Sequence, residues 1–322
     1  MLAISLLSVV QIGRGSGFGK VILFNEHFVV YGVPGIASAV DSTAYAEVRK
    51  TGKGIAIRDE RTGAKGYAEK KKAQQRDSFD RMLKAMGLSR ENISLEILLG
   101  GTLPSFSGIG ASAASSVAIA RAIANEFELG LSDEKINDIA YEAEKAYAGT
   151  PSGIDNTAAT FGGLIWFQKA LEGGSNIIER IEIRKPVEIV IGSTGIVADT
   201  KAMVAGVAAR AKEDSAKFDQ LCEQARELVL EARKALENFE LRKVGELMNQ
   251  NHFQLKEIQV SCEELDELVD LARENGAYGA KLTGGGGGGC MVALTPERSL
   301  QEKVAAAIEN RGFKVLKTRI GS

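Results

Sequence analysis

The 322-residue sequence has little cysteine, little histidine and almost no net charge. Its three cysteines (Cys222, Cys262 and Cys290) lie far apart and form no Cys-x-x-Cys pair, which argues against a disulfide framework and a zinc site. A reducing, cytoplasmic location is therefore expected. The net charge of -2 gives no indication of a nucleic-acid partner or an anionic membrane surface.

Long hydrophobic runs are also missing. No run approaches the roughly 18 apolar residues that a membrane-spanning helix needs. The first 13 residues, MLAISLLSVVQIG, are apolar over about ten positions but lack a basic start. We interpret them as a strand rather than as a signal peptide.

Glycine is abundant, with 36 residues against only five prolines. The glycines show no period, so collagen and repeat architectures are excluded. They gather at 13–19, 100–110 and 284–289. Clustered glycine indicates unusual backbone conformations or a backbone that something approaches closely.

Alternating hydrophobic patterns predict strands and helices along the whole chain. Strands are expected at 21–24, 28–31, 44–48, 93–99, 164–167, 187–191, 291–294 and 313–320. Helices are expected at 79–86, 112–127, 132–147 (with Ser132 as N-cap), 200–213, 215–237, 240–252, 262–275 and 299–310. Residues 51–75 are polar and predict a hairpin and a loop. This order predicts an α+β or mixed α/β protein of two domains, with an edge soon after the turn-rich residues 172–176.

The stretch GIGASAASS, residues 108–116, consists of Gly, Ala and Ser apart from Ile109. It leads into a helix. The first backbone N–H groups of a helix have no partners within it and lie at the positive end of the helix dipole. Such an N-terminus binds anions. A close helix–helix packing seam of small residues explains the stretch equally well. A Walker A loop is excluded because no Lys-Ser/Thr follows in register.

Glu144 continues the apolar line of Ile136 and Ala140 on its helix, so its carboxylate is expected to need a cation or a metal. A Glu at the edge of the stripe, paired with a lysine, is the simpler alternative. Asp155 lies in the turn-like segment PSGIDN, where an Asp is commonly only a turn former.

Two other polar groups interrupt apolar runs near the N-terminus. They are Lys20, after Gly19, and the trio at 25–27 that contains Glu26 and His27. Either group could be ordinary surface polarity. The second histidine, His252, lies on a helical pattern, which favours a structural role.

Six consecutive glycines at 284–289 stand between ordered segments. A flexible linker is one explanation, but the apolar Cys-Met-Val-Ala-Leu that follows favours a loop beside a phosphate.

Together these motifs resemble the GHMP kinase superfamily. Its three motifs occur in order as GKVILFNEHFVVYG (19–32), PSFSGIGASAA (104–114) and KLTGGGGGGC (281–290). The first motif, the segment EKAYAGTPSGIDN (144–156) and residues 199–207 resemble the mevalonate kinases within the superfamily. The sequence departs from the family pattern at Gly17-Phe18, where Ala-Pro is usual, at Asn25 (Gly), at Ala111 (Ser) and at Gly285 (Ala).

The resemblance implies an α+β, two-domain GHMP kinase fold. An ATP-binding and catalytic domain over 1–180, like the second domain of ribosomal protein S5, would precede a ferredoxin-like domain over 181–322. The implied reaction transfers a phosphoryl group from ATP, with Mg²⁺, to the 5-hydroxyl of mevalonate, a step of isoprenoid biosynthesis. A homodimer is common in the family and is expected.

The resemblance also implies residue roles. Asp155 would take or orient the hydroxyl proton and Lys20 would lie beside it, while Ser112 and Glu144 would hold Mg²⁺. Glu26, His27 and Thr200 would line the mevalonate side. The phosphate chain would be cradled by Pro104, Ser107, Gly108, Ile109, Gly110, Ala111, Ser112 and Ala113.

Two alternatives remain open. One is another small-molecule kinase of the superfamily, such as a phosphomevalonate or sugar kinase. A phosphorylated substrate would require further Lys or Arg beside the acceptor, and the first motif offers only Lys20. The other is a catalytically silent ATP-binding sensor, which could have lost any of Lys20, Ser112, Glu144 and Asp155.

Overall fold

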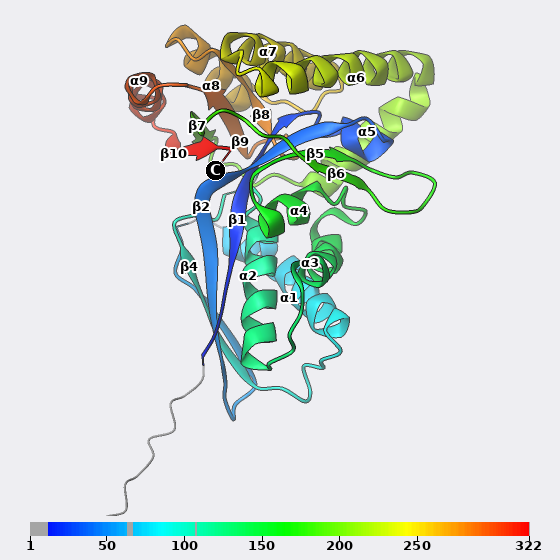
Figure 1. Ribbon diagram of the computed structural model, residues 1–322, viewed down its shortest axis with the longest axis vertical. Helices are drawn as coiled ribbons and strands as arrows, with labels where there is room; N and C mark the ends of the chain where they lie inside the picture. Colours follow the sequence, from blue (N-terminus) through cyan, green and yellow to red (C-terminus); the bar gives the residue numbers. More distant parts are fainter. Residues whose placement is uncertain (1–11, 63–66, 107, 322) are drawn as a thin grey trace, which may run out of the picture.

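The computed structural model describes residues 12–62, 67–106 and 108–321 of the chain (Figure 1). The strand expected within the first 13 residues lies almost wholly outside these ranges. Ser107 also lies outside them. Strand β1 begins at Gly13.

The first half of the chain forms a sheet with helices beside it. Strand β2 pairs antiparallel with β1, β4 and β5, and β5 pairs antiparallel with β6. Strand β3 pairs parallel with β4. In Figure 1, α1, α2, α3 and α4 lie on one side of β1, β2 and β4. The elements are β1 (Gly13–Phe24), the 3-10 helix η1 (Phe28–Tyr31), β2 (Gly35–Lys50), β3 (Ile55–Asp59), α1 (Tyr67–Ala85), β4 (Leu95–Gly101), α2 (Ala111–Glu126), α3 (Asp133–Ala148), α4 (Ile154–Phe161), β5 (Leu164–Gln168) and β6 (Ile177–Arg180).

The second half forms an antiparallel sheet in which β7 lies between β10 and β9, and β8 pairs with β9. Helices α7, α8 and α9 pack against its strands. A single pair, Ile320 of β10 with Val40 of β2, joins the two sheets. The elements are β7 (Val187–Ser193), α5 (Thr200–Glu213), α6 (Ser215–Glu237), α7 (Leu241–Glu257), α8 (Glu263–Glu274), β8 (Gly279–Thr283), β9 (Cys290–Leu294), α9 (Arg298–Asn310) and β10 (Lys314–Ile320).

The α+β class and most expected elements are confirmed. Ser132 caps α3 as predicted, since its side chain accepts a hydrogen bond from Lys135 N at 3.4 Å. The turn at 172–176 connects the β5–β6 hairpin, and strand pairing passes to the second sheet after β6. The domain boundary at 180–181 stays a prediction.

Three local predictions are wrong. Residues 28–31 form η1 rather than a strand, because the chain turns at Asn25, whose φ is 72°. Residues 51–75 contain β3, which joins β4 in parallel instead of forming a hairpin, and the first turns of α1. The turn-like segment PSGIDN, residues 151–156, ends early, because Gly153, with φ 99°, caps α4 and places Asp155 in its first turn.

The glycines of β1 allow α2 to lie directly on the strand. A Cβ at Gly13, Gly15 or Gly17 would come within 2.1–2.3 Å of the carbonyl oxygens of Ala122, Ala118 and Ala114. Those three helix positions are spaced by four, so they form one line along α2. The small residues of the 108–116 stretch and the helix after it therefore do form a packing seam, with a strand as the partner.

The six glycines at 284–289 form the β8–β9 connection and not a linker between domains. Five of them have positive φ, a conformation open to glycine at little cost. A Cβ at Gly284 would lie 2.5 Å from Gly108 Cα, so the second and third glycine motifs touch.

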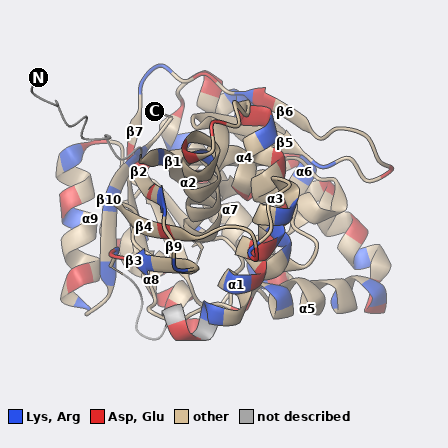
Figure 2. Ribbon diagram, turned by 90° about the horizontal axis from the view of Figure 1, so that it is seen from below, with Lys and Arg blue, Asp and Glu red and all other residues tan. Residues whose placement is uncertain are grey.

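Basic and acidic residues are interspersed along the helices in Figure 2. Within the described part of the chain, none of the helices combines the length and apolar character required to cross a bilayer.

Candidate active site

A cavity of about 140 Å³ lies where the three motifs meet. It is lined from both halves of the chain, by the end of β1 and the turn after it, the start of α2, the C-terminal part of α3, the start of α4, the start of α5 and the loop after β8. The lining includes Lys20, Glu26, His27, Lys71, Gly108, Gly110, Ala111, Ser112, Glu144, Tyr147, Asp155, Thr200, Gly284 and Gly285.

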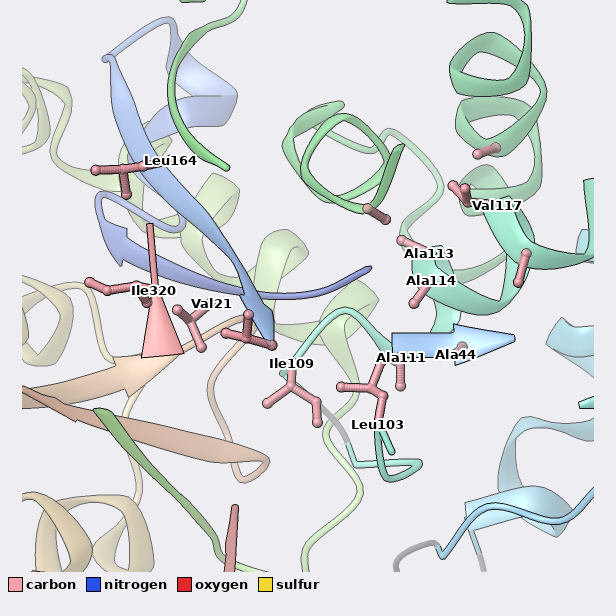
Figure 3. Close-up of a cluster of buried hydrophobic side chains, with 14 of the residues drawn as sticks. Val21, Ala44, Leu103, Ile109, Ala111, Ala113, Ala114, Val117, Leu164 and Ile320 are labelled. Carbon is pink, nitrogen blue, oxygen red and sulfur yellow. The ribbon is translucent and has the colours of Figure 1, made fainter. Parts of the chain in front are cut away.

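The glycine loop before α2 is hydrogen-bonded to β1 and anchored by one buried side chain. Ile109, its one large side chain, is buried beside Leu103 and Ala111 (Figure 3). Its carbonyl accepts a hydrogen bond from Lys20 N at 3.0 Å. Gly110 is the N-cap, with φ 70°, and no side chain caps the helix there. The first N–H groups of α2 are therefore available to an anion in the cavity.

Lys20 and Asp155 form an ion pair at the mouth of this cavity. The Lys20 ammonium lies 2.9 Å from Asp155 Oδ1. The lysine side chain is 1% exposed and the aspartate side chain 37%, so the carboxylate is the partner that a substrate can reach. A Cβ at Gly110 would come 2.6 Å from Lys20 Cγ, so the missing side chain makes room for the lysine.

Glu144 and Ser112 lie side by side behind that pair. The Ser112 hydroxyl donates to Glu144 Oε2 at 3.3 Å, while Glu144 Oε1 is buried without a hydrogen-bond partner. The pKa of Glu144 is raised from 4.5 to about 8, chiefly by burial and also by the nearby Asp155 carboxylate, against the lowering effects of Ser112 and Lys20. Ile136, Ala140 and Glu144 are all buried, as the stripe predicted. A buried, partly unsatisfied carboxylate favours a cation as ligand.

The remaining wall carries Glu26, His27 and Thr200. Glu26 pairs with the ammonium of Lys281, and His27 Nε2 lies 2.9 Å from the carbonyl of Gly285. Burial lowers the pKa of His27. Thr200 begins α5 and faces Gly285, since a Cβ there would lie 2.8 Å from Thr200 Oγ1.

The structure brings most of the expected site residues together. Lys20, Glu26, His27, Gly108, Gly110, Ala111, Ser112, Glu144, Asp155 and Thr200 all line the one cavity. The lining does not include Pro104 and Ile109 of the loop or Ala113 of α2, all of which are buried. His252 also lies outside it; its Nδ1 accepts from Leu282 N at 3.3 Å and its Nε2 faces Asp266 at 3.2 Å.

Two lysines were missed as site residues. The sequence marks Lys281 only as the start of the third motif, although a lysine within a strand that is buried throughout is an unusual feature. Lys71 of α1 lies in a segment predicted as loop. Its ammonium donates to the carbonyl of Ala198 at 3.3 Å, and burial lowers its pKa.

A larger neighbouring cavity, of about 650 Å³, opens between α1, α2 and the strands β3 and β4. It shares Ala111, Ser112 and Tyr147 with the first cavity, so the start of α2 borders both. Elsewhere its walls are mixed, with Phe79, Met82, Leu99 and Ile119 beside charged side chains.

No group of three or more His, Cys, Asp or Glu side chains suited to a metal occurs among the residues that the structure describes. Magnesium often uses only one or two carboxylates, with substrate phosphates and water as the other ligands. Glu144 with Ser112 meets that requirement.

Comparison with known proteins identifies the family. Residues 76–163 match the family model described as GHMP kinases N terminal domain, and residues 232–314 match GHMP kinases C terminal. The chain is 36% identical over 321 residues to the mevalonate kinase of Pyrococcus horikoshii, covering 94% of this chain and 93% of that protein. It is 34% identical to the mevalonate kinase of Thermococcus sibiricus, covering 94% of each.

Solved structures agree. The crystal structure of L. major mevalonate kinase in complex with R-mevalonate is 34% identical, with a TM-score of 0.88, over 96% of this chain and 95% of that one. The Methanococcus jannaschii mevalonate kinase, 22% identical with a TM-score of 0.77, covers 98% of this chain and 100% of its own and shares the fold. The expected two-domain GHMP kinase fold is therefore confirmed. The chain belongs to the GHMP kinases and, within them, to the mevalonate kinase family.

Proposed function

We propose that the protein phosphorylates the 5-hydroxyl of mevalonate with ATP and Mg²⁺, giving 5-phosphomevalonate and ADP. The observation that carries this proposal is the Lys20–Asp155 ion pair, which opens into the same cavity as the uncapped start of α2 and the Ser112–Glu144 pair. This arrangement puts a proton acceptor, a cation and an anion-binding helix end around one small space.

The acceptor hydroxyl would lie against Asp155, the more exposed member of the pair. Asp155 orients the hydroxyl and accepts its proton as the bond to phosphorus forms. Lys20 stabilises the negative charge on the reacting oxygens, because its side chain is buried and its charge acts in a low-dielectric surrounding. Phosphoryl transfer has a loose transition state, so positioning and charge stabilisation account for most of the catalysis.

Glu144 and Ser112 would hold Mg²⁺. The fit rests on Glu144 Oε1, a buried carboxylate oxygen without a partner, with a serine hydroxyl beside it. Oxygen ligands of this kind suit a hard cation. When bound, the ion supplies positive charge to the phosphate oxygens.

The nucleotide would extend from the start of α2 into the larger cavity. Its volume of about 650 Å³ is sufficient for an adenosine group, and it borders Ala111 and Ser112, where the phosphates are expected. Lys71 lines the smaller cavity from α1 and offers a second cation to the phosphate chain. Backbone N–H groups at 110–112 would bind the phosphate oxygens.

Glu26, His27 and Thr200 remain the proposed mevalonate side of the cavity. His27 is held at Nε2 by the Gly285 carbonyl, and the lowered pKa favours the neutral ring, which then donates at this atom. The homodimer and the cytoplasmic location expected from the sequence stay predictions.

A coupled ADP-release assay tests the function. ATP and Mg²⁺ are kept constant while mevalonate, phosphomevalonate, homoserine and galactose are offered in parallel. We expect turnover with mevalonate alone. Turnover with a different acceptor would transfer the roles of Glu26, His27 and Thr200 to that molecule. Binding of ATP without any turnover would favour the silent sensor.

A further inference from the structure

A second ion pair is buried against the cavity, and its lysine has no part in the transfer proposed above. The ammonium of Lys281 pairs with Glu26 Oε1, and the two side chains are 0% and 1% exposed. Lys281 also donates to the carbonyl of Leu282 at 2.7 Å. Burying two charges is costly even when they are paired, and an apolar pair of similar size often serves stability as well. Stability alone is therefore a poor explanation for this pair.

The position of Lys281 is set by contacts between the two halves of the chain. The Thr283 hydroxyl accepts from Ile22 N at 2.9 Å and donates to Ile22 O at 3.2 Å. Gly285, two residues further on, contacts His27. Every second residue from Lys281 to Gly285 thus contacts the end of β1 or the turn after it. This alternation brings the lysine of β8 to Glu26, a residue of the first half.

The charges around Glu26 come from two strands. Lys281 faces it from β8 and Lys20 from β1; burial raises the pKa of Glu26, and these two lysines, Lys281 more than Lys20, lower it. The charge of Lys281 also acts on His252 of α7, whose pKa is lowered to about 4, first by burial and then by Lys281, so that ring is neutral at neutral pH. Lys20 is meanwhile bound to Asp155 at 2.9 Å.

Two carboxylates, Asp155 and Glu26, can therefore attract the same ammonium. At buried sites charge interactions are screened far less than in water. A Glu26 carboxylate that kept its charge without its own cation would draw Lys20 away from Asp155 and from the phosphate. With Lys281 in place, the negative charge of Glu26 is already balanced.

We infer that Lys281 is a positioning residue for the proposed phosphoryl transfer: it balances the charge of Glu26 and so leaves Lys20 to Asp155 and the transferred phosphate. The inference rests on the proposed function, and it concerns a residue that touches neither substrate. It predicts that Lys281 is needed only while residue 26 is charged.

The test is a double-mutant cycle with Lys281→Gln and Glu26→Gln, measured by ADP release. Glutamine at 281 can still donate to Glu26 and to the Leu282 carbonyl, so the variant removes the charge more than the contacts. We expect Lys281→Gln to lower kcat by at least about tenfold, within the range of coupling between contacting residues. The double variant should regain most of this kcat, while its KM for mevalonate remains raised because Glu26 lines the acceptor side.

The comparison within the Glu26→Gln background is decisive even if Lys281→Gln alone does not fold. There the removal of Lys281 should leave kcat unchanged within about threefold. A further tenfold loss in that background would overturn the inference, since it would show that Lys281 acts independently of the Glu26 charge. Thermal unfolding of each variant shows which of them are folded.

Thr283→Val is the matched control, because it breaks an uncharged contact between the same strand and the same segment. Glu26→Gln should not restore the activity of Thr283→Val. If Glu26→Gln rescued Lys281→Gln and Thr283→Val equally, the loss of activity would reflect a loosened contact between the two segments. That result would also overturn the inference. The parent's turnover with mevalonate tests the function separately, and the cycle can be run with whichever acceptor the parent phosphorylates.

Discussion

Replacing Glu144 by Gln should make the protein without Mg²⁺ more stable at neutral and alkaline pH, although it removes a proposed metal ligand. The structure shows why: Glu144 is buried, one of its oxygens has no partner, and its pKa is raised from 4.5 to about 8. The folded protein therefore keeps a proton on Glu144 at pH values at which the unfolded chain has lost it. Stability contributed by this group falls as pH rises between the two pKa values.

The size of the effect follows from the two pKa values. At pH 7 the linkage relation gives a cost of the order of 3 kcal/mol for Glu144, and of the order of 1 kcal/mol at pH 5. Glutamine at this position has no charge to bury and can still accept from Ser112. The difference in unfolding free energy between Glu144→Gln and the parent should thus grow by roughly 2 kcal/mol over this range.

Urea unfolding in the presence of a chelator, at intervals from about pH 5 to about pH 8, measures this difference. Glu142→Gln is the matched control, since Glu142 lies on the same helix, half exposed, and pairs with Lys145 at 2.5 Å. Adding Mg²⁺ with ATP should then stabilise the parent more than Glu144→Gln. If both Gln variants follow the parent's pH dependence, burial does not control the protonation of Glu144, and the argument for a cation there loses its basis.

Three further predictions concern single side chains. Asp155→Asn should lower kcat by about 10²–10⁴-fold, the usual effect of losing a general base, and near-normal turnover would remove Asp155 from catalysis. Lys20→Met should lower kcat by about 10²–10³-fold with a smaller change in the KM for ATP, and the reverse pattern would place Lys20 on the nucleotide instead. Asn25→Gly should reduce the unfolding free energy by about 1–3 kcal/mol, because it removes the hydrogen bonds that the Asn25 amide donates to Pro34 O (2.7 Å) and Ala225 O (3.0 Å) and accepts from Asn251 Nδ2 (3.0 Å). A urea curve that matches the parent's would contradict this account of Asn25.

Much of the site was predictable because its chemistry is local in sequence. Helix α2 begins where the glycine stretch predicted, and Glu144 is buried where its stripe predicted. Asp155, by contrast, was placed in a loop, since only the left-handed Gly153 shows that α4 begins there. Its pairing with Lys20 depends on a contact between segments 135 residues apart, which no local pattern contains.

The contacts between the two halves were the least predictable part. Lys281 pairs with Glu26 only because β8 lies beside the end of β1, an arrangement that the Thr283–Ile22 bonds help to fix. Residues 28–31 predict a strand, because Phe, Val and Tyr favour strands. They form a 3-10 helix instead, in which Phe28 and Val29 are buried.

The departures from the family pattern have physical explanations that leave the proposed chemistry intact. Ala111 is 4% exposed and packs near Leu103 and Ile109 (Figure 3), while the adjacent Ser112 supplies the hydroxyl that contacts Glu144. Asn25 takes the left-handed conformation that glycine would adopt without strain, and its hydrogen bonds to three segments offset the cost. A Cβ at Gly285 would lie 2.8 Å from Thr200 Oγ1, so an alanine there would require Thr200 to shift. The glycine therefore leaves the Thr200 side of the cavity wider, and Gly285→Ala should affect the KM for the acceptor before it affects the KM for ATP.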